Sequence, residues 1–349
     1  NKQQMNGGLE MTSREFANLI GVSQSAVSRA LNGSGSIAPE TRTYIIKMAE
    51  EYGFVLNSQA KSLRTSKTGT IGVLFPPNFT CMSKNLMFTN LYDSLQHELI
   101  KRDYDILIID DFSVPHENQS FERILKSKKV DGFVNFRQNL SAKEIALIER
   151  FEIPFVSMHS ARQRYPQFHQ FILDTEAAGL RAGKFLGQHK LEQYLYVTTD
   201  SNIIEHSRRL RGYERGLSSE GVQLSENGIL SAPFDLQDIR QIILDNAELF
   251  RGKTTGIFAY NDMVGMAVCN ALTQLGISVP DCVQIISMDD IPMASWFYPR
   301  LTTLRTPVEQ MIGDGCSMLF RLVNGEKIAP QCQFYTSELI ERDTTCGIS

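Results

Sequence analysis

The stretch that organises the first part of the chain runs from Thr12 to Asn32 and reads TSREFANLIGVSQSAVSRALN. Thr12 and Glu15 form a capping box, in which each side chain accepts a hydrogen bond from the other residue's backbone amide. Apolar residues recur at helical spacing up to Gly21, a residue type that permits the left-handed turn at a helix end. Ser23 can cap a second short helix, so the stretch predicts two helices joined by a tight turn.

A third helix is expected from Pro39, which suits a first helical turn, to Gly53, which can end the helix. Two helices joined by a glycine-containing turn follow the plan of a helix-turn-helix motif. The second helix of the pair presents Gln24, Ser25 and Arg29 outward, and such side chains can reach base edges in a DNA major groove. The pattern favours DNA binding, with an ordinary three-helix bundle that has a polar face as the alternative.

The charge of the chain is distributed unevenly. The formal net charge is −4 over 349 residues. Residues 1–69 carry eight cations and five acids, a net charge of +3, and the remainder carries 27 cations and 34 acids, a net charge of −7. The total argues against a uniformly basic nucleic-acid-binding surface, but a small basic head on an acidic body is compatible with DNA binding.

From residue 70 onward, strand patterns alternate with helical patterns, which is typical of parallel sheets covered by helices on both faces. The expected strands are Ile71–Phe75, Asp105–Asp110, Gly132–Phe136, Phe155–Met158, Phe171–Asp174, Tyr194–Thr198, Gly256–Tyr260, Gln284–Met288 and Leu301–Leu304. Nine strands are many for a single sheet and natural for two, so the pattern predicts an α/β body with two sheets.

Motifs for catalysis, metal binding and membrane insertion are missing from the sequence. The six cysteines form no CxxC pair and the histidines no HExxH pattern, so neither a metal site nor a cofactor site is expected. Residues 252–254, Gly-Lys-Thr, resemble the end of a P-loop, but Ala247 stands where that motif needs its first glycine. No apolar run approaches the ~20 residues of a membrane span. The sequence predicts a cytoplasmic protein that is neither an enzyme nor a membrane protein.

Residues 22–32, VSQSAVSRALN, closely resemble the recognition-helix signature of the lactose-repressor (LacI/GalR) family of bacterial transcription regulators. The likeness continues through residues 41–42, 52–54 and 57–63, and then through the body to Asp343. The resemblance implies a sequence-specific repressor that binds a pseudopalindromic double-stranded operator as a homodimer. It also implies control of operator affinity by a small-molecule effector, with a sugar or sugar derivative expected, and favours release of repression by an inducer.

The family pattern assigns roles to individual residues of the head. Base contacts are expected from Gln24, Ser25 and Arg29. Phosphate contacts are expected from Thr12, Ser23, Ser28 and Asn32. A hinge helix in the minor groove is expected to contain Asn57, Ala60 and Leu63, with the leucine inserted between base steps. Two departures from the family pattern, Ala38 in place of serine and Leu56 in place of proline, weaken the start of the third helix and of the hinge.

The body resembles a periplasmic sugar-binding protein, in which two doubly wound parallel-sheet subdomains enclose a ligand cleft. In such sheets ligands lie beyond the carboxyl ends of strands, where this chain has Asp110, Asp174, Asn261 and Asp289. The resemblance assigns effector binding to Asp174, Arg209, Phe234, Asn261 and Asp289. Further candidates for the cleft lining are Phe79, Phe136 and Trp296, with core packing as the competing interpretation. For each acid the competing interpretation is that it caps a helix or is solvated at a strand end.

These inferences divide the chain into a disordered lead (1–10), a helix-turn-helix DNA-binding domain (11–56), a hinge (57–69) and an effector-binding and dimerisation domain (70–349). The last has an N-subdomain of about 70–161 plus a segment near 305–330, and a C-subdomain of about 162–300 plus the C-terminus. The alternatives are a sugar-binding module without a DNA role, and a regulator that uses a non-sugar effector such as a nucleobase as corepressor.

Overall fold

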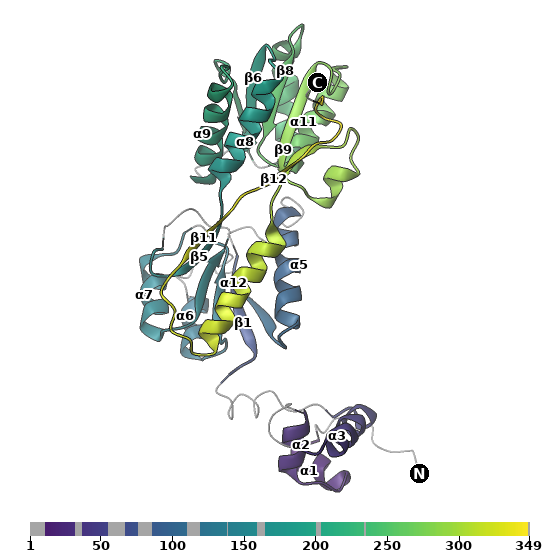
Figure 1. Ribbon diagram of the computed structural model, residues 1–349, viewed down its shortest axis with the longest axis vertical. Helices are drawn as coiled ribbons and strands as arrows, with labels where there is room; N and C mark the ends of the chain where they lie inside the picture. The colour runs from purple at the N-terminus through teal and green to yellow at the C-terminus, as the bar shows by residue number, and fades with distance from the viewer. Residues whose placement is uncertain are drawn as a thin grey trace. The chain divides into compact units, whose positions relative to one another are not determined.

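The computed structural model describes residues 11–31, 37–54, 67–75, 86–109, 119–137, 139–158, 165–199, 204–233 and 235–347. The chain divides into two compact units. One comprises Asn1–Gly69 with Lys128–Asp131, and the other comprises Thr70–Ser127 with Gly132–Ser349 (Figure 1).

The described residues of the first unit form three helices, α1 (Ser13–Leu19), α2 (Gln24–Leu31) and α3 (Pro39–Tyr52). Their small core is built from fully or nearly fully buried apolar side chains, among them Phe16, which stacks on Phe54 with ring centroids 4.1 Å apart. The core explains why so short a sequence folds, because none of the three helices is long enough to be stable alone in water.

The local signals in the head act as the sequence predicts. Thr12 and Glu15 form both hydrogen bonds of the capping box at the start of α1. Gly21 adopts a left-handed φ of 72° in the turn, and Oγ of Ser23 accepts a hydrogen bond from the amide of Ala26 at 3.1 Å, which caps α2. Ala38 leaves α3 without a side-chain cap, as its lack of a side-chain oxygen predicts.

The first sheet of the body has the strand order β11-β5-β4-β3-β1-β2, and all its neighbouring strands are parallel. Its strands are β1 (Thr70–Leu74), β2 (Asp105–Ile109), β3 (Gly132–Asn135), β4 (Phe155–Met158), β5 (His169–Leu173) and β11 (Cys332–Tyr335). One core joins this sheet to helices α5 (Leu86–Ile100) and α12 (Val308–Val323). The same half of the body contains α6 (Gln119–Lys126) and α7 (Ala142–Phe151).

The second sheet has the strand order β12-β10-β9-β8-β6-β7, and only the pair of β10 and β12 is antiparallel. Its strands are β6 (Gln193–Thr199), β7 (Ile229–Ala232), β8 (Thr255–Ala259), β9 (Val283–Asp289), β10 (Thr302–Arg305) and β12 (Glu338–Ile340). Helices α8 (Thr175–Gln188) and α9 (Ile204–Ser219) share one core with the sheet. Helices α10 (Leu236–Asp245) and α11 (Asp262–Gln274) share a second core on the other face, near the short 3-10 helices η2 (Ala247–Phe250) and η3 (Pro292–Ser295).

The two faces of the second sheet follow the two-residue period of a strand. Tyr194 and Tyr196 of β6 belong to the core under α8 and α9, whereas Leu195 and Val197 belong to the core under α10 and α11. Because side chains of consecutive strand residues point to opposite faces, a strand buried on both faces reads as a continuous apolar run. This accounts for the strong strand signal in the sequence.

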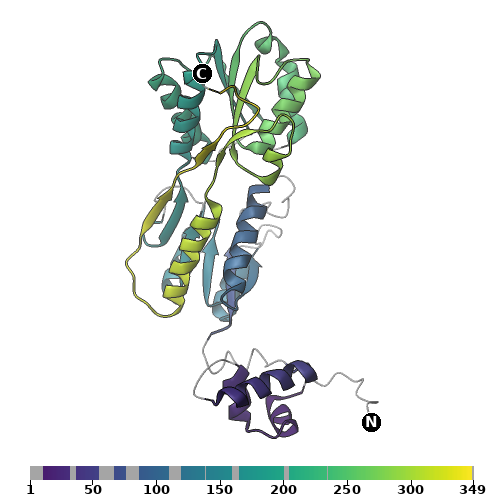
Figure 2. The same ribbon diagram turned by 45° about the vertical axis from the view of Figure 1, so that its right-hand side comes forward.

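All nine strands that the sequence predicts are present, each displaced by no more than two residues at either end. Three further strands, β7, β11 and β12, were not predicted. The strand β5 pairs with β4 and β11 in the first sheet, so this sheet continues to Leu173, beyond the subdomain limit expected near residue 162. The chain passes from one sheet to the other after β5, after β10 and after β11 (Figure 2).

Candidate functional site

The helix α2 exposes the three side chains that the sequence predicts to read bases. Gln24, Ser25 and Arg29 are exposed, whereas Val27 and Ala30 on the other side of the helix are buried in the core of the head. The polar surface of α2 is therefore available to a partner, and its orientation is fixed by the packing of the opposite face.

Local hydrogen bonds hold these side chains in place. Nε2 of Gln24 donates to Oγ of Ser13 at 2.8 Å. Nε of Arg29 donates to the carbonyl oxygen of Ser25 at 3.1 Å, and its Nη2 donates to Oγ of Ser25 at 3.3 Å. These contacts lie within the exposed surface, so the guanidinium and amide can exchange them for bonds to another polar molecule at little cost.

The predicted phosphate-contacting residues that the structure describes lie at the starts of α1 and α2 and within α2. Thr12 and Ser23 are exposed and act as helix caps, and Ser28 is half-buried. The remaining predictions for the head and hinge, which concern Asn32, Asn57, Ala60 and Leu63, lie outside the described residues.

In the body, α8 and α9 pack with backbone against backbone. Any Cβ added at Gly179 would collide with the carbonyl oxygen of Arg209, and one added at Gly212 would collide with that of Glu176. Gly183 and Gly216 continue the same close approach one turn further along. The glycines therefore set the position of α9, the helix that carries Arg209.

Three adjacent parallel strands, β6, β8 and β9, bring a polar cluster together at their carboxyl ends. Arg209 is 5% exposed, its Nη1 donates to the carbonyl oxygen of Tyr260, and its guanidinium carbon lies 4.2 Å from the centroid of the Tyr260 ring. The His206 ring lies against the same tyrosine with centroids 3.8 Å apart and the two ring planes tilted by 31°. Tyr260 follows β8 directly, and Asp289 ends β9. This is the edge at which α/β sheets bind ligands.

The electrostatics of the cluster are dominated by burial. Burial, with a smaller contribution from the nearby Asp262, raises the pKa of Asp289 to about 8, whereas Arg209 acts in the opposite direction. Burial and Arg209 together lower the pKa of His206 to about 3, so this imidazole is uncharged at neutral pH. Asp289 has a φ of 113°, and among the described residues its carboxylate has no hydrogen-bond partner. A strained backbone and a half-buried, uncommitted carboxylate with a raised pKa are features of ligand sites.

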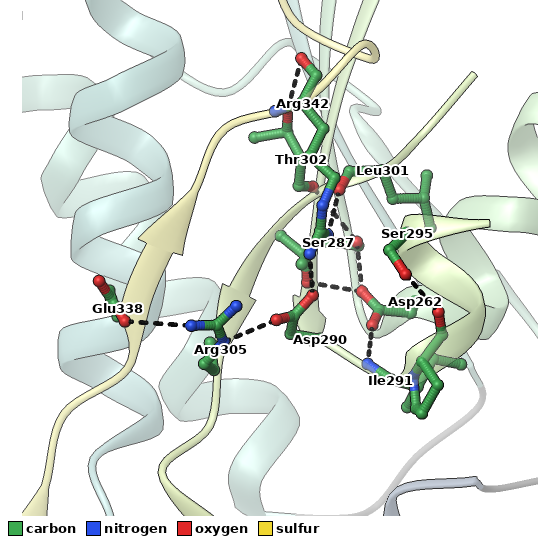
Figure 3. Close-up of polar contacts among 12 residues, drawn as sticks. Asp262, Ser287, Asp290, Ile291, Ser295, Leu301, Thr302, Arg305, Glu338 and Arg342 are labelled. Carbon is green, nitrogen blue, oxygen red and sulfur yellow. Dashed lines mark hydrogen bonds and ion pairs between the residues drawn. The ribbon is translucent and has the colours of Figure 1, made fainter. Parts of the chain in front are cut away.

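Asp262 supports the loop that carries Asp289. Its carboxylate is 1% exposed and accepts hydrogen bonds from Oγ of Ser287 at 2.5 Å, Oγ1 of Thr303 at 2.6 Å and the amide of Ile291 at 2.8 Å (Figure 3). Burial raises its pKa to about 6 despite these three bonds. Asp262 thus ties β9, β10 and the loop before η3 into one unit.

The neighbouring acid, Asp290, is committed to ion pairs on the other side of the loop. Its Oδ2 lies 2.7 Å from Nε of Arg305, and its Oδ1 lies 2.6 Å from Nη2 of Arg342 (Figure 3). The two consecutive aspartates therefore have different partners, and Asp290 anchors β10 and the segment after β12.

The other predicted effector residues are placed differently. Asp174 accepts a hydrogen bond from the amide of Ala177 at 3.1 Å, and Asn261 accepts one from Val264 at 3.0 Å, so each caps a helix. Phe136 is buried in the first core and stacks on Phe75, so core packing accounts for it. Trp296, for which core packing was the competing interpretation, is 85% exposed. Phe79 and Phe234 lie outside the described residues.

Sequence reasoning did not select His206 or Tyr260. A signal for His206 was present, because it precedes Arg209 by three residues and such pairs share one face of a helix. Tyr260 precedes Asn261 at the end of a predicted strand, but an aromatic residue there is not distinguishable from the strand's own apolar run.

The described residues contain no group of three or more His, Cys, Asp or Glu side chains that could hold a metal ion. In the same part of the chain, no helix is both long and apolar enough to cross a membrane.

Two family models match the chain. Residues 12–57 match the model of bacterial regulatory proteins of the lacI family, and residues 185–345 match a periplasmic binding protein-like domain. The first match covers the three helices of the head, and the second covers most of the second sheet with its helices.

Relatives along the whole length are transcription regulators. The chain is 24% identical over 334 residues to the HTH-type transcriptional repressor PurR of Vibrio campbellii, covering 95% of this chain and 98% of the relative. It is 25% identical over 344 residues to the HTH-type transcriptional regulator DegA of Bacillus subtilis, covering 98% and 100%.

Solved structures share the fold. A lac repressor dimer bound to operator and the anti-inducer ONPF has a TM-score of 0.78 at 16% identity, with 97% of this chain and 100% of that chain covered. A complex of the transcriptional regulator CelR with cellobiose has a TM-score of 0.68 at 20% identity, with 95% and 99% covered.

Proposed function

Because the chain belongs to the lacI family of bacterial regulatory proteins and is a DNA-binding transcriptional regulator, we propose which of its residues perform the two halves of that function. Gln24, Ser25 and Arg29 of α2 read operator bases, and the cluster around Arg209 and Asp289 binds the effector. The relatives named as repressors support repression as the outcome of DNA binding, in the cytoplasm where the DNA lies.

The observation that carries the DNA assignment is the composition of the exposed face of α2. A guanidinium and an amide stand five residues apart on the exposed part of α2, and these are the groups that recognise guanine and adenine in the major groove. The segment of residues 1–69 has a net charge of +3 on a chain of −4, which favours attraction of phosphate to the head alone.

The experiment for this half is selection of DNA sites from a random pool by the full chain, followed by binding titrations of the selected site. Arg29→Ala is expected to weaken specific binding by about 1–3 kcal/mol, the value of a good base contact. Lys47→Ala is the matched control, because it removes one exposed cation from α3 instead of α2. Equal losses in the two variants would contradict the base-reading role and leave only general attraction to phosphate.

The effector proposed for the body is a sugar or sugar derivative. Support comes from the combination of a buried arginine, an uncommitted carboxylate and an aromatic ring at the carboxyl ends of three neighbouring strands. Charged groups of this kind fix hydroxyls, and a ring can cover the apolar face of a sugar. A thermal-shift screen of sugars and nucleobases tests the assignment, because a bound ligand raises the melting temperature.

A homodimer is proposed as the working form. Two large apolar side chains, Trp296 and Tyr298, are 85% and 89% exposed on one loop after β9, and Met293 in the preceding η3 is 47% exposed. Clustered exposed apolar side chains mark surfaces that associate with a partner. In a dimer, two heads would bind the two half-sites of a pseudopalindrome. Sedimentation of the full chain as a monomer at micromolar concentration would contradict this.

A further inference from the structure

Three buried polar atoms on α9 lack a hydrogen-bond partner among the described residues, namely Nε2 of His206, Nε of Arg209 and the hydroxyl oxygen of Tyr213, and the first two belong to side chains that both contact Tyr260. His206 and Arg209 are only 6% and 5% exposed. A buried polar atom left unsatisfied costs roughly 1–3 kcal/mol, so two of them one helical turn apart call for a specific explanation. Both side chains contact the ring of Tyr260, which keeps the two orphan atoms in one neighbourhood.

The hydrogen bonding of His206 fixes what its free nitrogen can do. Nδ1 lies 2.8 Å from Oγ1 of Thr198, and that hydroxyl directs its hydrogen toward the carbonyl oxygen of Thr199 at 3.4 Å. When the single hydroxyl hydrogen is directed at Thr199, Nδ1 carries the ring proton and donates it, and this is the tautomer that we assign to His206. Nε2 is therefore a hydrogen-bond acceptor, and it needs a donor from a ligand.

The charges around this position are already balanced. Arg209 contributes one positive charge, and burial raises the pKa of Asp262 to about 6 and that of Asp289 to about 8. Burial, together with the repulsion of Asp289 by Asp262, disfavours ionisation of both carboxyls at once, while burial keeps His206 neutral by lowering its pKa. An anionic ligand would add a buried charge without a counter-charge, which is costly.

We infer that His206 is a specificity residue of the effector site: its Nε2 accepts a hydrogen bond from a ligand hydroxyl, while Nε of Arg209 donates one. The site thereby takes an uncharged, hydroxyl-bearing compound and discriminates against the anionic counterpart of the same compound. A hydroxyl suits both atoms because it can donate and accept, whereas a phosphate or carboxylate oxygen presents only lone pairs to Nε2. The inference rests on the proposed function, since it concerns the same site.

The test uses the full chain and matched pairs of probes, namely glucose with glucose 6-phosphate and glucuronate, galactose with galacturonate, and ribose with ribose 5-phosphate. Binding is measured by thermal shift and by calorimetry. The neutral member of at least one pair is expected to bind at least about tenfold more tightly than its anionic partners, the ratio expected when one member leaves buried polar atoms unpaired.

Two variants then isolate the nitrogen. His206→Phe keeps an aromatic ring against Tyr260 and removes Nε2, and it is expected to weaken binding of the neutral sugar about tenfold. His206→Gln restores an acceptor oxygen and is expected to recover part of the affinity. Binding of the selected DNA by the ligand-free variants is measured alongside, because retained DNA binding shows that each variant still folds a working head.

Three results would overturn the inference. They are equal or tighter binding of the anionic members, binding of none of the neutral sugars, and unchanged sugar affinity in His206→Phe. The last result would mean that a buried water satisfies Nε2 instead of a ligand. None of the three touches the DNA half of the proposed function, which fails only if no DNA site is selected.

Discussion

Replacement of Asp262 by alanine and by asparagine tests whether the hydrogen bonds of this residue hold the loop between β9 and η3. The carboxylate Oδ1 accepts from the hydroxyls of Ser287 and Thr303, and Oδ2 accepts from the backbone amide of Ile291. Alanine removes all three acceptors. Asparagine can retain three bonds, because its oxygen can face the fixed amide while its two N–H groups donate to the two hydroxyls, which rotate to accept.

The magnitude follows from counting the donors that each variant strands. In Asp262→Ala, Ser287 has an alternative acceptor in the carbonyl oxygen of Thr302 at 3.4 Å, whereas Thr303 and Ile291 lose their acceptor. Two stranded donors at roughly 1–3 kcal/mol each give a loss of about 2–6 kcal/mol. In Asp262→Asn each of the three groups keeps a hydrogen bond, although the hydroxyl of Thr303 then accepts and its own hydrogen loses the carboxylate. Because both variants lack the buried charge, the difference between them, roughly 2 kcal/mol or more, excludes the cost of burying a carboxylate.

The assay is urea denaturation at pH 7 followed by circular dichroism, with the slope compared among the three proteins so that a change in midpoint reports stability. The expected order is Asp262→Asn at or above the unmodified chain, and Asp262→Ala well below Asp262→Asn. Equal stability of the two variants would refute the argument that these three hydrogen bonds hold the loop.

Three further predictions concern pH, helix packing and association. Burial raises the pKa of Asp289 from 3.8 to about 8, so the stability due to its bound proton is complete below pH 3.8 and is lost as pH rises through about 8. Asparagine at this position does not titrate, so the stability of Asp289→Asn relative to the unmodified chain should rise between pH 5.5 and 8.5 in urea titrations. A constant difference would contradict the raised pKa of Asp289. Gly179→Ala should destabilise the body by about 1–3 kcal/mol, because its methyl group meets the backbone of Arg209. The control Gly313→Ala in α12 meets nothing and should stabilise the body by about 0.5–1 kcal/mol. Thermal melts that show similar effects of the two variants would count against the close packing of α8 and α9. Trp296→Ser should shift sedimentation toward the monomer, while Ile229→Ser, at another exposed apolar residue on β7, should leave the dimer intact; a dimer in both would remove this loop from the interface.

The head was predictable because its signals are local. A capping box, a left-handed glycine and a capping serine each act within four residues, and each forms the expected contact. The central strands were predictable for a similar reason, since strands buried on both faces are continuous apolar runs. The missed strands β7, β11 and β12 are short edge strands with exposed residues, and only tertiary pairing defines them.

The site was predictable only in part. The rule that ligands lie at strand ends led to Asp289 and, with the family pattern, to Arg209. The same position in the chain is also where the next helix begins, so Asp174 and Asn261 satisfied the rule while capping α8 and α11. Sequence alone does not separate these roles, because both require a polar side chain after a strand. The spacing of His206 and Arg209 places both on one helix face, but the approach of Tyr260 and Thr198 to His206 is a tertiary contact that the spacing does not predict.

The most direct test of the account is the affinity of the full chain for its selected DNA site, measured by fluorescence anisotropy with and without the sugar that gives the largest thermal shift. The account predicts that a saturating sugar changes the DNA dissociation constant by roughly 5–150-fold, the usual range of coupling between two sites. It also predicts that Asp289→Asn keeps the sugar-free affinity and loses this response. A sugar that binds the body and leaves DNA affinity unchanged would contradict the account.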